Sequence, residues 1–167
     1  MLKKLILLLI VIAPMTIFAQ DKIAFINSNE IFSKMPELKD VESKLATKRE
    51  TITKNAAAIE KEYNDLVEMF GKDSTSNLTE SIILDRQNQL ESLQKRYQDF
   101  MQTSQAEYGK EQETLLAPVQ QKMRQAIQTV GTENNYTYIL DAGALLHVGA
   151  NAIDASKLVK AKLGITD

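Results

Sequence analysis

The sequence predicts an α+β protein, mostly α, in which a long antiparallel coiled-coil hairpin of two helices projects from a small β-containing body. Residues 36–134 contain almost no glycine or proline, as long helices require. Within them Leu38, Leu45, Ile52, Ile59 and Leu66 recur every seven positions, which is the spacing of a coiled-coil seam. Short segments with the composition of strands lie outside this stretch, at both ends of the chain. We call residues 36–113 the arm, and residues 20–35 and 114–167 the body.

The first 19 residues have the features of a cleaved secretory signal peptide. Lys3 and Lys4 form a basic start, residues 5–12 are an unbroken apolar run, and Ala19 is a small residue before the expected cut. The apolar run is shorter than the roughly 20 residues that a helix needs to cross a bilayer. We expect residues 1–19 to be removed; an uncleaved anchor is the less favoured alternative.

Composition argues against several classes of function. The chain has no cysteine and one histidine, so it offers neither a Cys/His metal cluster nor a thiol nucleophile. It also shows no glycine-rich phosphate loop. Loss of Lys3 and Lys4 leaves 18 basic against 22 acidic residues, which changes the net charge from -2 to -4 and does not favour nucleic-acid binding. We expect no enzyme activity, no metal and no cofactor.

The body begins with a strand and a short helix. Residues 22–27 read as a strand, and Asn27 with Glu30 has the spacing of a helix-capping box. The short helix should end at Met35, because a residue before proline is disfavoured in helical geometry. Pro36 then suits the first turn of the first long helix.

The first long helix should end near Phe70, and the tip of the arm should lie near residues 71–77, which are polar and contain Gly71. Asn77 with Glu80 repeats the capping spacing and should start the return helix. A connection centred near residue 75 predicts three pairs of seam residues facing each other: Leu66 with Ile83, Ile59 with Leu90, and Ile52 with Tyr97.

The return helix changes character after Tyr97. Three sets of residues there are spaced by eleven positions, a repeat that runs straighter than a heptad coiled coil. They are Met101, Gln112 and Met123; Ser104, Leu115 and Ala126; and Tyr108, Val119 and Val130, of which Gln112 and Ser104 are polar. Pro118 lies inside this helix and should bend its axis. A hinge between arm and body and a bend with no functional role are equally good interpretations of Pro118. The helix should end near Asn134 and Asn135.

The C-terminal part of the body should add two strands and a helix. Residues 136–140 and 145–148 have strand composition, and Asp141 with Gly143 suggests an Asx-type turn between them. His147 would then be a half-buried strand residue rather than a catalytic base. Asp154 or Ser156 should cap a last helix that ends at Gly164.

Such a body is too small to be stable alone. Roughly 65 residues with three short strands leave open sheet edges and a minimal core, and no disulfide can compensate. Assembly of several subunits through their strands, into a closed barrel, would remove the edges. We therefore expect a homo-oligomer, most simply a trimer, with the arms projecting from a shared base.

The arm should carry the binding surface. Apolar side chains gather toward its tip, where Tyr63, Met69, Phe70, Leu78 and Ile82 lie within a few turns of the connection. Methionine and aromatic side chains can repack against varied partners at low cost. The alternative, that these residues only pack the end of the hairpin, stays open.

Several segments resemble the Skp/OmpH family of periplasmic chaperones. The resemblance rests on residues 21–27 (DKIAFIN), residues 30–32 (EIF), the long charged hairpin, residues 136–142 (YTYILDA) and residues 154–156 (DAS). It covers the whole mature chain, and the segments at the two ends are more specific than the hairpin.

The resemblance implies a homotrimer with a small β-barrel and three arms that hold unfolded outer-membrane β-barrel proteins in the periplasm without ATP. It places the oligomerisation body at Ile23, Phe25, Ile139, Leu140 and Leu146. It also places the client-binding surface on the inner faces of the arms, which would include Ala56, Tyr63, Met69, Phe70, Leu78, Ile82 and Met101.

The charge of the arm departs from the family. Residues 37–113 carry 11 basic and 16 acidic residues, whereas well-known family members are strongly basic. A contact with lipopolysaccharide or an anionic membrane is therefore not expected. The alternative function is that of a structural or adaptor coiled coil of the cell envelope that docks one defined partner.

Overall fold

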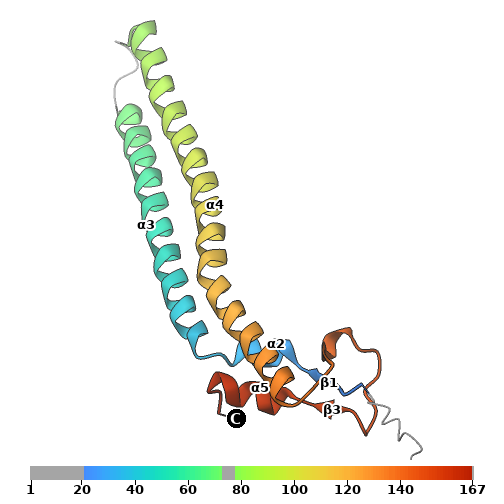
Figure 1. Cartoon of the computed structure of the whole chain (residues 1–167). Helices are drawn as coiled ribbons and strands as arrows, with labels where there is room; N and C mark the ends of the chain where they lie inside the picture. The colour runs from blue at the N-terminus through green and yellow to red at the C-terminus, as the bar shows by residue number, and fades with distance from the viewer. Residues whose placement is uncertain (1–20, 73–77, 167) are drawn as a thin grey trace, which may run out of the picture.

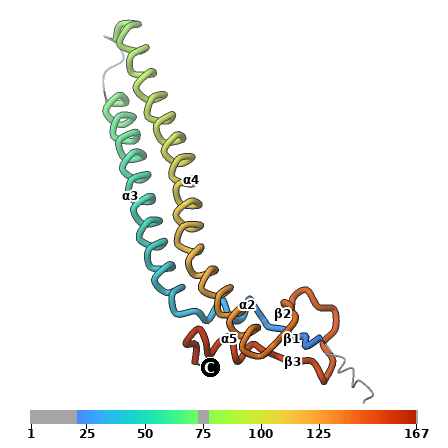
Figure 2. The backbone as a smooth tube through the Cα atoms, viewed as in Figure 1, coloured from blue at the N-terminus to red at the C-terminus, as the bar shows by residue number. Residues whose placement is uncertain are grey.

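The computed structural model describes residues 21–72 and 78–166 of the chain. Two long helices, α3 (Glu37–Lys72) and α4 (Glu80–Glu133), run side by side (Figure 1). α3 and the part of α4 up to residue 113 form the arm, and the rest of α4 enters the body. A three-stranded sheet and two short helices, α2 (Ser28–Ser33) and α5 (Ser156–Leu163), gather at one end of the arm and form the body (Figure 2). The predicted α+β architecture, mostly helical, is confirmed; the barrel between subunits stays a prediction.

The sheet joins the two ends of the chain. β1 (Ile23–Ile26) is central, between β2 (Tyr138–Asp141) and β3 (Ile153–Asp154), and both pairs are parallel. Parallel neighbours require a long connection, and between β1 and β2 that connection is the whole arm. The arm is therefore an insertion between two strands that hydrogen-bond side by side.

The predicted strand at residues 145–148 was wrong. The chain after β2 forms a short 3-10 helix, η2 (Ala142–Ala144), and then a loop, and the third strand is β3. Asp141 Oδ1 accepts a hydrogen bond from the backbone N–H of Gly143 at 2.7 Å, which confirms the Asx-type turn and ends the strand. The open edge of β1 pairs instead with Ile153, so pairing with a distant residue outweighed local strand propensity.

The hydrophobic core lies between the sheet, the foot of α4 and the short helices. Ala24 and Ile26 of β1, Ile31 of α2, Val130 of α4 and Val159 of α5 are each at most 3% exposed. Burial of a side chain of this size contributes about 1.5–3 kcal/mol relative to leaving it in water. β1, α2, α5 and the foot of α4 thus contribute to one core.

Two of the predicted helix ends are confirmed. Asn27 Oδ1 accepts from the backbone N–H of Glu30 at 3.0 Å and caps α2. Gly164 ends α5 with a φ of 72°, a left-handed conformation that disfavours residues with a Cβ, and Ile165 beyond it is buried.

The start of α5 differs from the prediction. Its N-cap position is Ala155, and no side chain caps it there. Asp154 Oδ1 accepts from the backbone N–H of Ser156, and the Ser156 hydroxyl accepts from the backbone N–H of Asn27 at 3.1 Å. Ser156 therefore joins α5 to the end of β1 rather than capping its own helix.

The helix α3 ends later than predicted, and the return helix α4 also starts later. α3 continues to Lys72, and α4 starts at Glu80 after Thr79, whose hydroxyl accepts from the backbone N–H of Ile82. Thr79 therefore occupies the capping position that was predicted for Asn77, a residue outside the described ranges. At 1.5 Å per residue the 36 residues of α3 span about 54 Å.

The predicted pairs of facing residues in the arm were wrong, because the α4 partners lie farther along the chain than predicted. Ile59 lies with Tyr97, which had been expected to face Ile52, and not with Leu90; the partners of Leu66 are displaced in the same direction. At the tip, α4 extends farther from the body than α3 does (Figure 1). Each residue of α3 therefore meets a residue farther along α4 than expected.

The helix α4 continues through Pro118, and its axis curves in the half nearer the body (Figures 1 and 2). Val41 of α3 and Val119 of α4 are buried there and join both helices to the core. An ion pair between Glu37 and Lys122 adds a polar link across the same region. The role of Pro118 as a moving hinge stays a prediction.

Candidate functional site

The arm is more loosely packed than the body. Among the described residues of its outer half, the buried apolar side chains are Ile59 of α3 and Leu93 of α4. Closer to the body, the next buried residue of α4 is the polar Ser104. Lys48 and Arg49 take places where a continuous seam would have apolar residues. The two helices therefore leave gaps. Three cavities open along one side of the arm, and one of about 360 Å³ opens on the other side, lined mostly by polar side chains.

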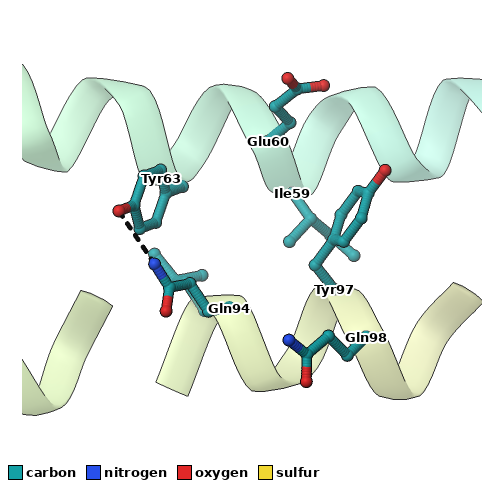
Figure 3. A pocket seen from close by; sticks show the side chains of 7 residues that line it. Ile59, Glu60, Tyr63, Gln94, Tyr97 and Gln98 are labelled. Carbon is teal, nitrogen blue, oxygen red and sulfur yellow. Dashed lines mark hydrogen bonds between the residues drawn. The ribbon is translucent and has the colours of Figure 1, made fainter. Parts of the chain in front are cut away.

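The central cavity lies midway along the arm and has a volume of about 280 Å³. Figure 3 shows Tyr63 projecting from α3 and Tyr97 from α4, on either side of Ile59. The Tyr63 hydroxyl accepts a hydrogen bond from Gln94 Nε2 at 3.0 Å, and this bond fixes the ring across the two helices. Seven residues line the cavity: Ile59, Glu60, Tyr63, Leu93, Gln94, Tyr97 and Gln98.

An outer cavity lies next to the central one, nearer the tip. It has a volume of about 520 Å³, and Tyr63 and Gln94, which are hydrogen-bonded to each other, line both cavities. Phe70 and Leu78 also line it, and the guanidinium of Arg86 stacks on the Phe70 ring with its carbon 4.8 Å from the ring centre. The tip therefore presents apolar surface partly covered by a cation.

An inner cavity of about 210 Å³ lies nearer the body and is lined by Ile52, Met101 and Tyr108 among others. Arg49 donates to the Tyr108 hydroxyl at 3.0 Å and stacks on its ring. Met101 follows Tyr97 by four positions, so both residues lie on the same side of α4. The three cavities thus open on one side of the arm.

We call this side the aromatic face and define it by the large side chains along it: Tyr63, Phe70, Tyr97, Met101 and Tyr108. The other side of the seam is polar. Arg96 pairs there with Glu62, and Lys48 pairs with Glu107 at 2.9 Å. Exposed pairs of this kind contribute about 0.2–1 kcal/mol each. They set the register of the helices more than they stabilise them.

The residues predicted for client binding fall into two groups. Tyr63, Phe70 and Leu78 come together in the outer cavity, and Met101 lines the inner one. Ala56 is half-buried, while Met69 and Ile82 are 51% and 41% exposed and line none of the three cavities. The aromatic face also contains two residues that sequence reasoning did not assign to it.

These two residues are Tyr97 and Tyr108. The sequence placed both on the helical repeat that should fill the seam, which concealed their partial exposure. Their spacing from Met101, four positions before and seven after, is the signal that would have placed all three on one side of α4.

A second apolar surface lies on the body. Ile23 pairs with Tyr138 and Phe25 with Leu140, and residues in register project to the same side of a sheet. Ile23 is 47%, Tyr138 57% and Leu140 40% exposed. Phe25 is half-buried. We call these four residues the sheet face.

The residues predicted to build the oligomer are distributed unequally with respect to this surface. Ile23, Phe25 and Leu140 belong to the sheet face. Ile139 projects to the opposite side and packs against the core of its own chain. Leu146 is fully exposed in the loop after η2.

The strongest polar link in the body joins its two short helices. Lys160 of α5 is only 8% exposed, and its Nζ donates to Glu30 Oε1 of α2 at 2.7 Å. Hydrogen bonds from Lys160 and then Lys34 lower the pKa of the Glu30 carboxyl below its ordinary value. Glu30 therefore stays ionised and holds α5 against α2.

Two other carboxyls have lowered pKa values for structural reasons. The hydrogen bond from Lys122 lowers the pKa of Glu37 at the start of α3. Hydrogen bonds from the Ser28 side chain and from a backbone N–H lower the pKa of Asp141 in its turn. All these carboxylates bind partners within their own chain, an arrangement that suits anchors rather than proton donors.

His147 lies exposed in the loop after η2, so the prediction of a half-buried strand residue was wrong. Within residues 21–72 and 78–166, no group of three or more His, Cys, Asp and Glu side chains is arranged to hold a metal ion. In the same ranges no helix combines the length and apolarity needed to cross a membrane.

Comparison with known proteins agrees with this architecture. Residues 22–163 match the family described as outer membrane protein (OmpH-like). The fold is also similar to the crystal structure of a protein from Caulobacter crescentus CB15, provisionally named an OmpH-like outer membrane chaperone, with a TM-score of 0.73. The two are 16% identical, and the match covers 87% of this chain and 85% of that one. No curated protein matches the chain.

Proposed function

The chain belongs to the OmpH-like family, and on that basis we propose that it is an ATP-independent holdase chaperone of the periplasm. It binds outer-membrane β-barrel proteins while they are unfolded and encloses them between the arms of a trimer. The Caulobacter protein with the same fold is itself named an outer membrane chaperone. The signal peptide expected at residues 1–19, outside the described ranges, supports a periplasmic location.

The observation that carries this proposal is the aromatic face. An unfolded client exposes apolar side chains at irregular intervals, so a chaperone needs many weak and adaptable contacts rather than one rigid pocket. The aromatic face offers a methionine, four rings and three open cavities in succession along the arm. No single residue dominates such a surface, which allows client segments to bind and leave repeatedly.

The sheet face supports the assembly of several subunits. Four large apolar side chains on a sheet of three short strands would be poorly stable in water and are suited to burial against another subunit. Closure of several such sheets into a barrel buries these residues and points the arms in a common direction. The arms then form a cage around the client.

The direct test is a holdase assay on the mature protein, residues 20–167. An unfolded outer-membrane β-barrel protein is diluted from urea, and its aggregation is followed by light scattering at increasing chaperone concentration. Analytical ultracentrifugation of the same sample counts the subunits. We expect full suppression near one trimer per client without ATP. A monomer at micromolar concentration, or tight binding of one folded partner with no suppression, would contradict the proposal.

A matched pair of variants tests the sheet face. Leu140 and Leu158 are 40% and 41% exposed, but only Leu140 lies on the sheet face, whereas Leu158 lies on α5. Leu140→Glu should abolish assembly, because it places a charge in the proposed interface, and it should also abolish aggregation suppression. Leu158→Glu should leave both unchanged. Equal effects of the two substitutions would exclude the sheet face as the interface.

A further inference from the structure

We propose that the central cavity is a defined subsite for one apolar or aromatic side chain of an unfolded client, with a preference for side chains that neighbour lysine or arginine. The proposal rests on the holdase function and adds to it one preferred contact among the many on each arm. It is argued from the shape of the cavity, from its polar groups and from its charge.

The shape of the cavity suits a single side chain. Its floor consists of Ile59 and Leu93, which are 9% and 6% exposed, and the rings of Tyr63 and Tyr97 form its sides (Figure 3). Its volume of about 280 Å³ lies just below the range of roughly 300–1,000 Å³ that drug-sized ligands occupy. An extended segment can insert one residue there, whereas a docked helix would need a longer groove.

The polar groups around the cavity suit an extended backbone. Gln94 is engaged by the Tyr63 hydroxyl and fixes that ring. The Tyr97 hydroxyl and the Gln98 amide make no hydrogen bond to any other residue that the structure describes. A hydroxyl and an amide can each donate and accept. They can therefore bind the N–H and C=O groups on either side of an inserted residue.

The charge at the rim distinguishes this cavity from its neighbours. Glu60 lies at the rim and makes no ion pair within the described part of the chain, whereas Glu62 on the other side of the arm is paired with an arginine. The outer and inner cavities instead carry Arg86 and Arg49, each stacked on a ring. The central cavity thus combines uncovered aromatic walls with an acidic rim, which complements a basic neighbour in the client.

A peptide-binding experiment tests this assignment. The protein contains no tryptophan, so a tryptophan in a peptide reports its own burial by a blue shift of its fluorescence. Two unstructured glycine–serine peptides are titrated with the mature oligomer: one has tryptophan between two lysines, the other has tryptophan between two glutamates. We expect the lysine peptide to bind about two- to fivefold more tightly, and the difference to shrink at 0.5 M NaCl.

Variants of the cavity locate the site. Tyr97→Ala should weaken both peptides about tenfold, because it removes one aromatic wall. Glu60→Gln should bring the two affinities together, because it weakens binding of the lysine peptide and removes the repulsion of the glutamate peptide. Glu111→Gln is the matched control, because it removes an exposed negative charge of α4 outside the three cavities and should change neither affinity. Circular dichroism confirms that each variant is folded.

The outcomes separate this proposal from the function on which it rests. If the wild type suppresses aggregation but binds the two peptides equally, or if Tyr97→Ala binds them as the wild type does, the subsite is wrong and the holdase function stands. The same conclusion follows if the oligomer binds neither peptide. A neighbouring arm or a partner helix would then fill the cavity. Failure of the wild type to suppress aggregation would overturn the function itself.

Discussion

Truncation of one isoleucine in the body and one in the arm should have very different costs. Ile31 is fully buried in the body core, and its replacement by alanine leaves a void among well-packed neighbours. Isoleucine-to-alanine substitutions at such sites cost about 2–5 kcal/mol. Ile59 is 9% exposed and already borders the central cavity, so its side chain has fewer contacts to lose. We expect Ile59→Ala to cost less than about 2 kcal/mol.

Urea unfolding followed by circular dichroism at one fixed protein concentration measures both costs. The concentration must be fixed because assembly contributes to the stability of an oligomer. With an m-value of about 2 kcal/mol per molar urea, Ile31→Ala should lower the midpoint by about 1–2.5 M, and Ile59→Ala by less than about 1 M. Hydrogen exchange should show Ile59→Ala increasing exchange in α3 and α4 near the cavity while the body stays protected.

Equal decreases of the urea midpoint in the two variants would refute this reasoning. If Ile59→Ala lowers the midpoint as much as Ile31→Ala, the outer arm is packed as tightly as the core. The cavities would then be closed in solution, and a surface of weak, adaptable contacts would lose its structural basis.

Three other predictions concern two glycines, the bend in α4 and pH. Gly109→Ala should stabilise the protein by about 0.5–1 kcal/mol, since the added methyl group meets nothing within 4 Å. Gly164→Ala should destabilise it by about 1 kcal/mol, because the φ of this residue is 72°. Thermal unfolding measures both changes. If Pro118 is a hinge, Pro118→Ala should narrow the distribution of distances measured between a spin label on the arm and one on the body. An unchanged distribution would show that the proline has no role in motion. The pKa of Glu37 is lowered by its bond to Lys122, so this bond stabilises the fold fully above the pKa of glutamate in the unfolded chain, near 4.3. The stabilisation is lost as the pH falls through the lower pKa of the folded state. The Glu37→Gln variant should therefore lose less stability than the wild type between about pH 5 and 3. Identical losses in the two proteins would show that the bond does not contribute.

Local signals in the sequence predicted the local structure correctly. The seven-residue repeat indicated the hairpin, the Asn27 and Glu30 spacing indicated the start of α2, and Gly164 indicated the end of α5. Each of these features depends on residues within a few turns of one another, so propensity, capping and steric restriction decide them.

Features that depend on distant residues were harder to predict. The partners across the arm depend on how far α4 rises beyond α3 at the tip, and no seam residue encodes that distance. The third strand is the two-residue Ile153–Asp154, which is too short to have a pattern and forms because β1 offers an open edge. Residues 145–148 have better strand composition but no partner in the sheet.

The candidate site was predicted only in part for the same reason. The sequence indicated apolar residues at the tip, including Tyr63 and Phe70, and these do line a cavity. It did not indicate that Tyr97 and Tyr108 would lie beside Met101 on an open side, because openness follows from gaps between two helices. A seam position and a surface position look alike until the partner helix is in place.

A crosslinking measurement tests the central claim most directly. A photoreactive phenylalanine derivative replaces Phe70 on the aromatic face or, as a control, Gln89 on the other side of the arm. The mature protein is mixed with an unfolded outer-membrane protein and illuminated, and crosslinked client is quantified by mass spectrometry. We predict strong crosslinking from position 70 and little from position 89. Equal crosslinking from both positions, or crosslinking from position 89 alone, would contradict the account.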